Sequence, residues 1–190
     1  MGGETGARHS AAPMLMTDRL RLRAHTAADF EASAAMWGDS EVTRFIGGRP
    51  FTAEESWTRL LRCAGHWALM GFGYWAVEER ATGKFIGEAG FADYKRDIEP
   101  PVVDMPEIGW AFVREAHGRG IATETARALV AWGDVHFGTR ATTCLIDEGH
   151  TTSIRVAEKC GYREWRRVNY HGQTEILFRR EARGGVVKAG

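Results

Sequence analysis

The sequence lacks an excess of charge of either sign. Its 190 residues contain 25 Lys and Arg against 25 Asp and Glu, so the formal net charge is zero. Proteins that bind nucleic acid or an anionic membrane surface through overall charge carry a clear basic excess. We therefore expect neither nucleic acid nor a membrane among the partners of this protein.

Long apolar runs, cysteine pairs and metal motifs are also missing. No run approaches the ~18 apolar residues of a membrane span, and the first residues lack the apolar core of a secretory leader. Cys63, Cys144 and Cys160 are odd in number and have no ligand spacing, which predicts reduced thiols in a cytoplasmic protein. The histidines form no HxH or HExxH pattern, so we predict no metal site.

Periodicity predicts a single domain over residues 17–180, with flexible tails at 1–16 and 181–190. Strands are predicted at 19–24, 74–79, 85–94, 106–113, 141–146, 162–170 and 174–179. Helices are predicted from Thr26 to about residue 37, after Thr52, and over 120–137 and 151–160. This order indicates an α/β (α+β) fold with a mixed, mostly antiparallel sheet of about seven strands and helices on both faces.

A turn with two glycines joins the strand at 106–113 to the long helix that follows it. The first turn of a helix exposes unpaired N–H groups at its positive end, and glycines let a phosphate approach the backbone closely. Arg119 adds a cation at the same place. The pattern matches neither a P-loop nor a dinucleotide fingerprint, and two glycines are also ordinary turn chemistry.

Several segments together resemble the GNAT N-acetyltransferases. They are 107–112 (EIGWAF), 117–124 (HGRGIATE) and 151–162 (TTSIRVAEKCGY), supported by 17–23 (TDRLRLR) and 85–91 (FIGEAGF). The resemblance is best to the branch that includes ribosomal-protein N-terminal acetyltransferases, and it covers residues 17–180.

The resemblance implies that acetyl-CoA lies where the parallel strands 106–113 and 141–146 splay apart. The acceptor amine then attacks the thioester directly, without an acyl-enzyme. The residues implied to contact acetyl-CoA are Trp110, Ala111, Phe112 and Val113 along the pantetheine, then His117, Gly118, Arg119, Gly120, Ile121, Ala122 and Thr123 at the pyrophosphate, with His150 and Ser153.

Three positions depart from the family pattern. His117 stands where the family has Gln or Arg, and His150 stands where it usually has Asn. Ala157 occupies the place of a Tyr that protonates the leaving thiolate in many members, although the branch resembled here often lacks it.

Glu107, Glu88 and Ser153 are the candidate catalytic residues. Amine acetylation needs a proton acceptor, and Glu107 at the start of the central strand is the first candidate, with Glu88 on the neighbouring strand as the second. Ser153 is a candidate donor to the CoA sulfur or pantetheine. The alternative readings are a solvent-exposed strand-end charge for Glu107, a cross-strand ion pair for Glu88 and a first-turn hydroxyl for Ser153.

Trp37, Trp57, Phe45 and Phe51 are the candidate acceptor-binding residues, because the resemblance places the acceptor beside the first two helices. The loop 44–51 between those helices could close over the substrate. The loop 93–105 carries Asp93, Asp97, Glu99 and Asp104, which could attract a cationic acceptor or simply be solvated.

Taken together, the sequence and the resemblance predict an acetyl-CoA-dependent N-acetyltransferase. Its acceptor is the primary amine of a protein N-terminus or a small metabolite, and a homodimer is compatible with this prediction. The alternative is a catalytically weak sensor protein that binds CoA or acetyl-CoA, which Ala157 and His150 favour.

Overall fold

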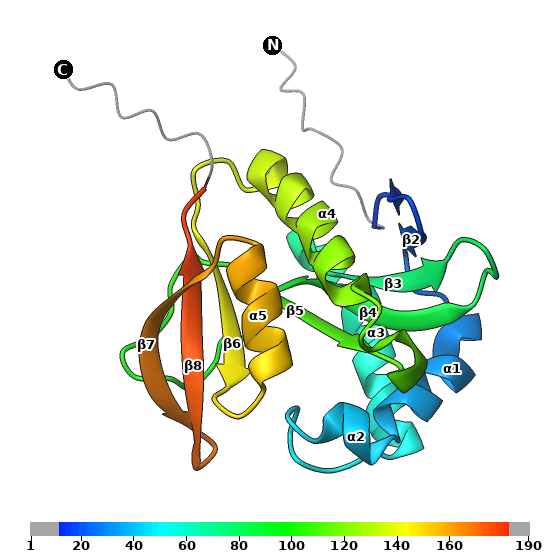
Figure 1. The fold of residues 1–190 in the computed structure, drawn as a ribbon, viewed down its shortest axis with the longest axis horizontal. Helices are drawn as coiled ribbons and strands as arrows, with labels where there is room; N and C mark the ends of the chain where they lie inside the picture. The colour runs from blue at the N-terminus through cyan, green and yellow to red at the C-terminus, as the bar shows by residue number, and fades with distance from the viewer. Residues whose placement is uncertain (1–11, 183–190) are drawn as a thin grey trace.

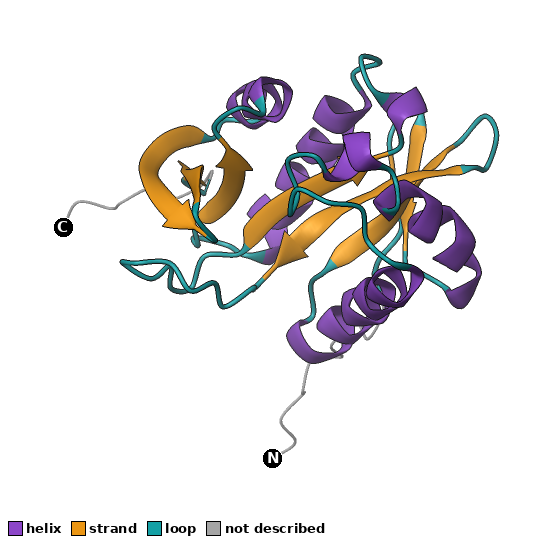
Figure 2. Ribbon diagram, turned by 90° about the horizontal axis from the view of Figure 1, so that it is seen from below, coloured by secondary structure: helices purple, strands orange, loops and turns teal. Residues whose placement is uncertain are grey.

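The computed structural model describes residues 12–182 and shows one sheet with helices on both faces (Figures 1 and 2). The strands are β1 (Leu15–Met16), β2 (Leu20–Arg23), β3 (Tyr74–Glu79), β4 (Phe85–Ala92), β5 (Glu107–Phe112), β6 (Thr142–Asp147), β7 (Arg163–Tyr170) and β8 (Gln173–Arg180). The helices are α1 (Phe30–Trp37), α2 (Ser40–Thr43), α3 (Ala53–Met70), α4 (Ile121–His136) and α5 (Thr151–Lys159).

The strand order in the sheet is β1-β2-β3-β4-β5-β6-β8-β7. β5 and β6 run parallel, and the other neighbouring strands described here are antiparallel. Helices α4 and α5 lie on one face, with α1 and α3 on the other (Figure 1). The predicted fold class is therefore confirmed, including the splayed parallel pair at its centre.

Local sequence signals set the helix ends. At the start of α3, the Glu55 amide donates to Thr52 Oγ1 at 3.2 Å and the Thr52 amide donates to Glu55 Oε2 at 2.8 Å. This reciprocal capping box satisfies two of the otherwise unpaired N–H groups of the first turn. At the end of α5, Gly161 adopts a φ of 90°, as a glycine after a helix commonly does.

The folded part of the chain begins earlier than the sequence predicted. Leu15 and Met16 pair with β2 as the edge strand β1, and the Trp75 indole N–H donates to the Pro13 carbonyl at 2.7 Å. Residues 12–16 are therefore part of the fold, and the sheet has eight strands among residues 12–182 instead of seven. The rest of the predicted tails, 1–11 and 183–190, lies outside the described residues.

The main core lies between the sheet and α4, where Trp75, Phe91, Trp132 and Phe137 pack edge-to-face or stacked. β4 approaches β5 so closely that a Cβ at Gly87 would lie 2.4 Å from the Ala111 carbonyl oxygen. No helix formed by the described residues is both long and apolar enough to cross a membrane.

Candidate active site

β5 and β6 separate soon after they meet. They share one register pair, Glu107 with Thr143, and the Thr143 amide donates to the Pro106 carbonyl at 3.0 Å. Beyond this point the two strands diverge (Figure 1), while β6 stays paired with β8. The splay leaves one edge of β5 without a neighbouring strand.

The register decides which backbone groups of β5 face this gap. The Val113 amide donates to the Ile86 carbonyl of the β4 side at 3.0 Å, so the odd-numbered residues of β5 direct their backbone groups toward β4. Trp110 and Phe112 therefore present theirs to the gap. The backbone amides of Ala111 and Val113 point away from it.

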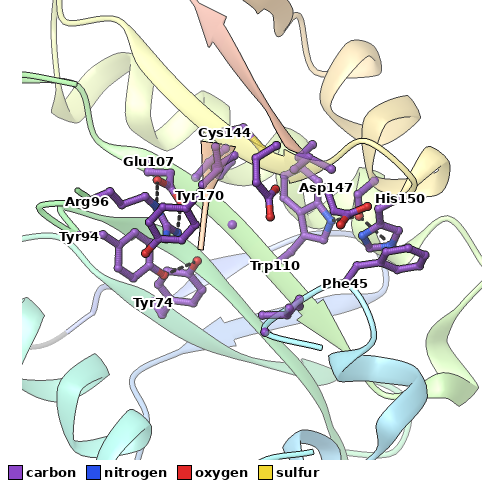
Figure 3. Close-up of a pocket in the computed structure, with 18 of the residues that line it drawn as sticks. Phe45, Tyr74, Tyr94, Arg96, Glu107, Trp110, Cys144, Asp147, His150 and Tyr170 are labelled. Atoms are coloured by element: carbon purple, nitrogen blue, oxygen red, sulfur yellow. Dashed lines mark hydrogen bonds and ion pairs between the residues drawn. The ribbon is translucent and has the colours of Figure 1, made fainter. Parts of the chain in front are cut away.

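A cavity of about 440 Å³ opens beside the gap (Figure 3). Its lining combines aromatic rings with three arginines and three carboxylates. The charged residues are Arg59, Arg62, Arg96, Glu107, Asp147 and Glu175. The cavity therefore offers charged groups that can orient a charged substrate between aromatic walls.

An ion pair and two tyrosines form one end of the cavity. Arg96 Nε and Nη2 each donate to Glu107 at 2.6 Å, so both carboxylate oxygens of Glu107 are engaged. The guanidinium of Arg96 lies 4.4 Å from the Tyr94 ring centroid and 5.0 Å from that of Tyr170. These contacts fix the orientation of Arg96 and Glu107 together.

Tyr74 lies behind this pair. The Tyr94 hydroxyl donates to the Tyr74 hydroxyl at 3.0 Å, and burial raises the pKa of both phenols. Tyr74 passes directly under β5, where a Cβ at Gly109 would lie 2.1 Å from its hydroxyl oxygen. Gly109 is therefore required for Tyr74 to reach its place.

His150 and Ser153 form the other end of the cavity. The His150 ring stacks on Phe45 with centroids 4.4 Å apart, and burial lowers the pKa of His150. Ser153 Oγ accepts from the Trp110 indole N–H at 3.3 Å and lies 3.2 Å from His150 Nε2. Because the indole occupies a lone pair of Ser153, the hydroxyl proton is left to donate to His150 or to a bound group.

Trp37, Phe51 and Arg59 form a side wall. Trp37 stacks on Phe51 at a centroid distance of 5.0 Å, and the Arg59 guanidinium lies 4.0 Å from the Trp37 ring. Arg59 Nε donates at 2.6 Å to Glu88, which is fully buried and does not line the cavity. The predicted catalytic candidate Glu88 is therefore a buried ion-pair partner, although its partner comes from α3 and not from a neighbouring strand.

The predicted phosphate turn has the backbone that such a site requires. Gly118 and Gly120 adopt φ values of 70° and 76°, and α4 begins at Ile121 without a side-chain cap. Its first amides are therefore unpaired in the structure. Arg119 pairs with Glu79 at 2.5 Å, and His117 Nε2 donates to the Phe112 carbonyl at 3.0 Å.

Comparisons with known proteins show which family has this architecture. Residues 19–163 match the family model described as an acetyltransferase (GNAT) domain. The Bacillus subtilis protein YkkB, described as uncharacterized, is 35% identical over 162 residues, covering 80% of this chain and 86% of its own. The chain belongs to the GNAT acetyltransferase family.

Solved structures share the fold of this GNAT acetyltransferase. A GNAT-family acetyltransferase structure from Bordetella pertussis superposes with a TM-score of 0.78 at 31% identity, covering 89% of this chain and 99% of that one. The spermidine N-acetyltransferase of Vibrio cholerae, in complex with CoA and spermine, has a TM-score of 0.70 at 14% identity, covering 87% and 97%. At that identity the second likeness shows the fold alone.

The structure moves some predicted acceptor residues out of the site. Trp37, Phe45 and Phe51 line the cavity, but Trp57 does not; it is 38% exposed and packs edge-to-face on Phe30. The acidic side chains at 93, 97, 99 and 104 do not line it either. The loop that carries them contributes the cation Arg96 instead.

Sequence reasoning missed Arg96, Asp147 and Glu175, which line the cavity of this acetyltransferase. Asp147 had a usable signal, because it ends the strand that splays from β5, and ligands gather at the ends of such strands. Arg96 and Glu175 had none, since a loop and the final hairpin bring them to the site only in the folded chain.

A buried polar cluster lies under the cavity wall. His25, Cys63 and Glu88 place their ligand atoms within 4.8 Å of one another. Arg59 already neutralises Glu88, and burial together with Glu88 raises the pKa of Cys63 to about 12, which disfavours the thiolate that binds metals. The absence of a metal site remains a prediction.

Proposed function

We propose that this GNAT protein transfers the acetyl group of acetyl-CoA directly to a primary amine of a protein N-terminus or a small metabolite. The observation that carries the proposal is the splay of β5 and β6. It leaves the backbone groups of Trp110 and the amide of Phe112 to bind an extended substrate arm, since the Phe112 carbonyl already accepts from His117, and it opens into a cavity large enough for an acceptor amine.

In this proposal the amides of residues 118–123 hold the pyrophosphate, with the positive end of α4 behind them. Arg119 and the exposed glycines Gly118 and Gly120 are part of that turn. The V. cholerae enzyme that shares this fold was solved with CoA and spermine, which supports a CoA site beside an amine site.

The chemistry requires polarisation of the thioester carbonyl and protonation of the leaving thiolate. We assign polarisation to the gap-facing amides of Trp110 or Phe112, because a fixed N–H dipole needs no reorganisation during the reaction. Ser153 is the proton donor in this proposal, since the Trp110 indole leaves its hydroxyl proton available. Glu107, held by Arg96, fixes the acceptor end of the cavity.

Two measurements test the proposal. A thermal shift with CoA alone tests the binding site, and a thiol-release assay with acetyl-CoA tests transfer to a panel of amines. The panel contains spermine, an aminoglycoside and peptides with free N-termini. Stabilisation by CoA together with thiol release supports the proposal. Stabilisation without thiol release from any amine rejects transfer and favours the sensor alternative, and no stabilisation rejects both.

A further inference from the structure

The carboxylates near the cavity differ in their partners. Glu88 and Glu107 each accept hydrogen bonds of 2.6 Å from an arginine. Within residues 12–182, by contrast, the Glu175 carboxylate has neither a hydrogen bond nor a salt bridge, although it lines the cavity. Glu175 is therefore the carboxylate whose lone pairs are free to meet a substrate.

Glu175 lies directly opposite a second carboxylate. It is the register partner of Asp147 on the antiparallel β6–β8 pair, and both side chains line the cavity. Directly opposed side chains of such a pair have Cβ atoms roughly 4.5–5.5 Å apart, so two like charges there repel each other. Asp147 keeps one oxygen occupied, because its Oδ1 accepts from the Gly149 amide at 2.7 Å.

The surroundings make Glu175 a stronger base than an ordinary carboxylate. Burial and the charge of Asp147 raise the pKa of Glu175 to about 7, with Glu107 acting in the same direction and Arg96 against it. Tyr170 of β7 and His150 before α5 also line this space, and burial lowers the pKa of His150. A general base is most effective when its pKa is close to the working pH.

The charged side chains of the cavity favour the binding of a cationic substrate. Arg59 and Arg96 each form a salt bridge with a glutamate, whereas Asp147 and Glu175 form no salt bridge among the described residues. Arg62 is the remaining lining cation; it is exposed at the rim and lies 5.5 Å from the Tyr94 ring. An ammonium group is therefore stabilised most strongly beside these two adjacent carboxylates, because neither has a salt-bridge partner.

Resting on the proposed acetyl transfer, we propose that Glu175 accepts the proton of the acceptor ammonium and that Asp147 beside it binds the same charged group. One proton passes from the ammonium to Glu175, which frees the nitrogen lone pair. The nitrogen then bonds to the thioester carbonyl carbon, the C–S bond breaks and its electron pair leaves on sulfur. The Ser153 hydroxyl protonates the thiolate and takes the second nitrogen proton in exchange, and Glu175 returns its proton to solvent.

Glu175→Gln tests this assignment, because the amide keeps the shape and loses the base. With saturating acetyl-CoA and the best acceptor of the panel, we expect kcat to fall roughly 10²–10⁴-fold, the range that a general base contributes. The wild-type kcat should rise with pH around pH 7, as Glu175 loses its proton. This rising limb of the pH profile should be absent in the variant. Asp147→Asn should instead raise KM for the amine and shift the rise in kcat to lower pH, because the charge that helps to raise the pKa of Glu175 is gone.

Glu164→Gln is the matched control, because Glu164 is an exposed carboxylate on the neighbouring strand β7. It should leave kcat and the pH profile unchanged, and CoA should stabilise every variant as it does the wild type. Wild-type kinetics in Glu175→Gln, or a retained limb near pH 7, overturns the inference while the proposed function stands. A wild-type protein that releases no thiol with any amine overturns both.

Discussion

Replacing Gly118 with alanine separates the role of the turn before α4 in folding from its proposed role in binding a pyrophosphate. Gly118 has a φ of 70°, and a Cβ built on it meets no atom within 4 Å. The only expected loss of folding stability in the variant comes from its left-handed backbone, about 1–2 kcal/mol for an L-residue. A domain of this size loses about 2–4 °C in Tm per kcal/mol, so Tm should fall by roughly 2–8 °C.

Gly83 provides a matched control in the turn between β3 and β4. Its φ is 68°, and a Cβ there also meets nothing within 4 Å. Gly83→Ala should therefore lose about the same Tm as Gly118→Ala. The two should differ in CoA binding, because only position 118 lies in the turn that leads into the first amides of α4.

Isothermal titration calorimetry with CoA and with pantetheine measures the difference. We expect Gly118→Ala to weaken CoA at least tenfold, roughly 1.4 kcal/mol, and to bind pantetheine, which lacks the pyrophosphate, as the wild type does. Gly83→Ala should bind both normally. Wild-type CoA affinity in Gly118→Ala, or an equal loss in both variants, would refute a pyrophosphate site at this turn.

Three further predictions concern the cavity and the thiols. Gly109→Ala should destabilise the fold by about 1–3 kcal/mol through its clash with the Tyr74 hydroxyl, and adding Tyr74→Phe should restore much of the loss in a denaturant titration; no recovery would contradict the packing. Glu107→Gln should lower turnover more than it weakens CoA binding and should keep the kcat limb near pH 7; unchanged turnover removes Glu107 from the mechanism, and loss of the limb makes it the base. The three cysteines are buried with raised pKa values, so Ellman's reagent should label none in the native protein and three after unfolding, whereas rapid native labelling would contradict their burial.

The sequence predicted most elements of the fold because their signals are local. The capping box at Thr52, the strict alternation at 19–24 and the glycine after α5 each act within a few residues, and the structure begins or ends an element at each. The edge strand β1 escaped prediction because two residues carry no periodicity. Its order depends on β2 and on Trp75, which lies 62 residues from Pro13 in the chain.

The candidate site divides in the same way. The glycine turn before α4, the splayed strand and Ser153 could be read from short motifs, because each motif is contiguous. Trp57 lies outside the cavity, because the resemblance placed the acceptor beside a whole helix and did not show which face of that helix lines the site. The residue is 38% exposed, and its ring packs edge-to-face on Phe30.

By itself, the sequence determined the order of the elements, the family likeness and the turn proposed for the pyrophosphate, since all three depend on neighbours along the chain. Only the tertiary structure decided which carboxylates are free. Arg59 from α3 neutralises Glu88, and Arg96 from a loop neutralises Glu107. The pairing of β6 with β8 brings Asp147 beside Glu175 across 28 residues of chain, and the basicity of Glu175 arises from that proximity and from burial, which no local pattern encodes.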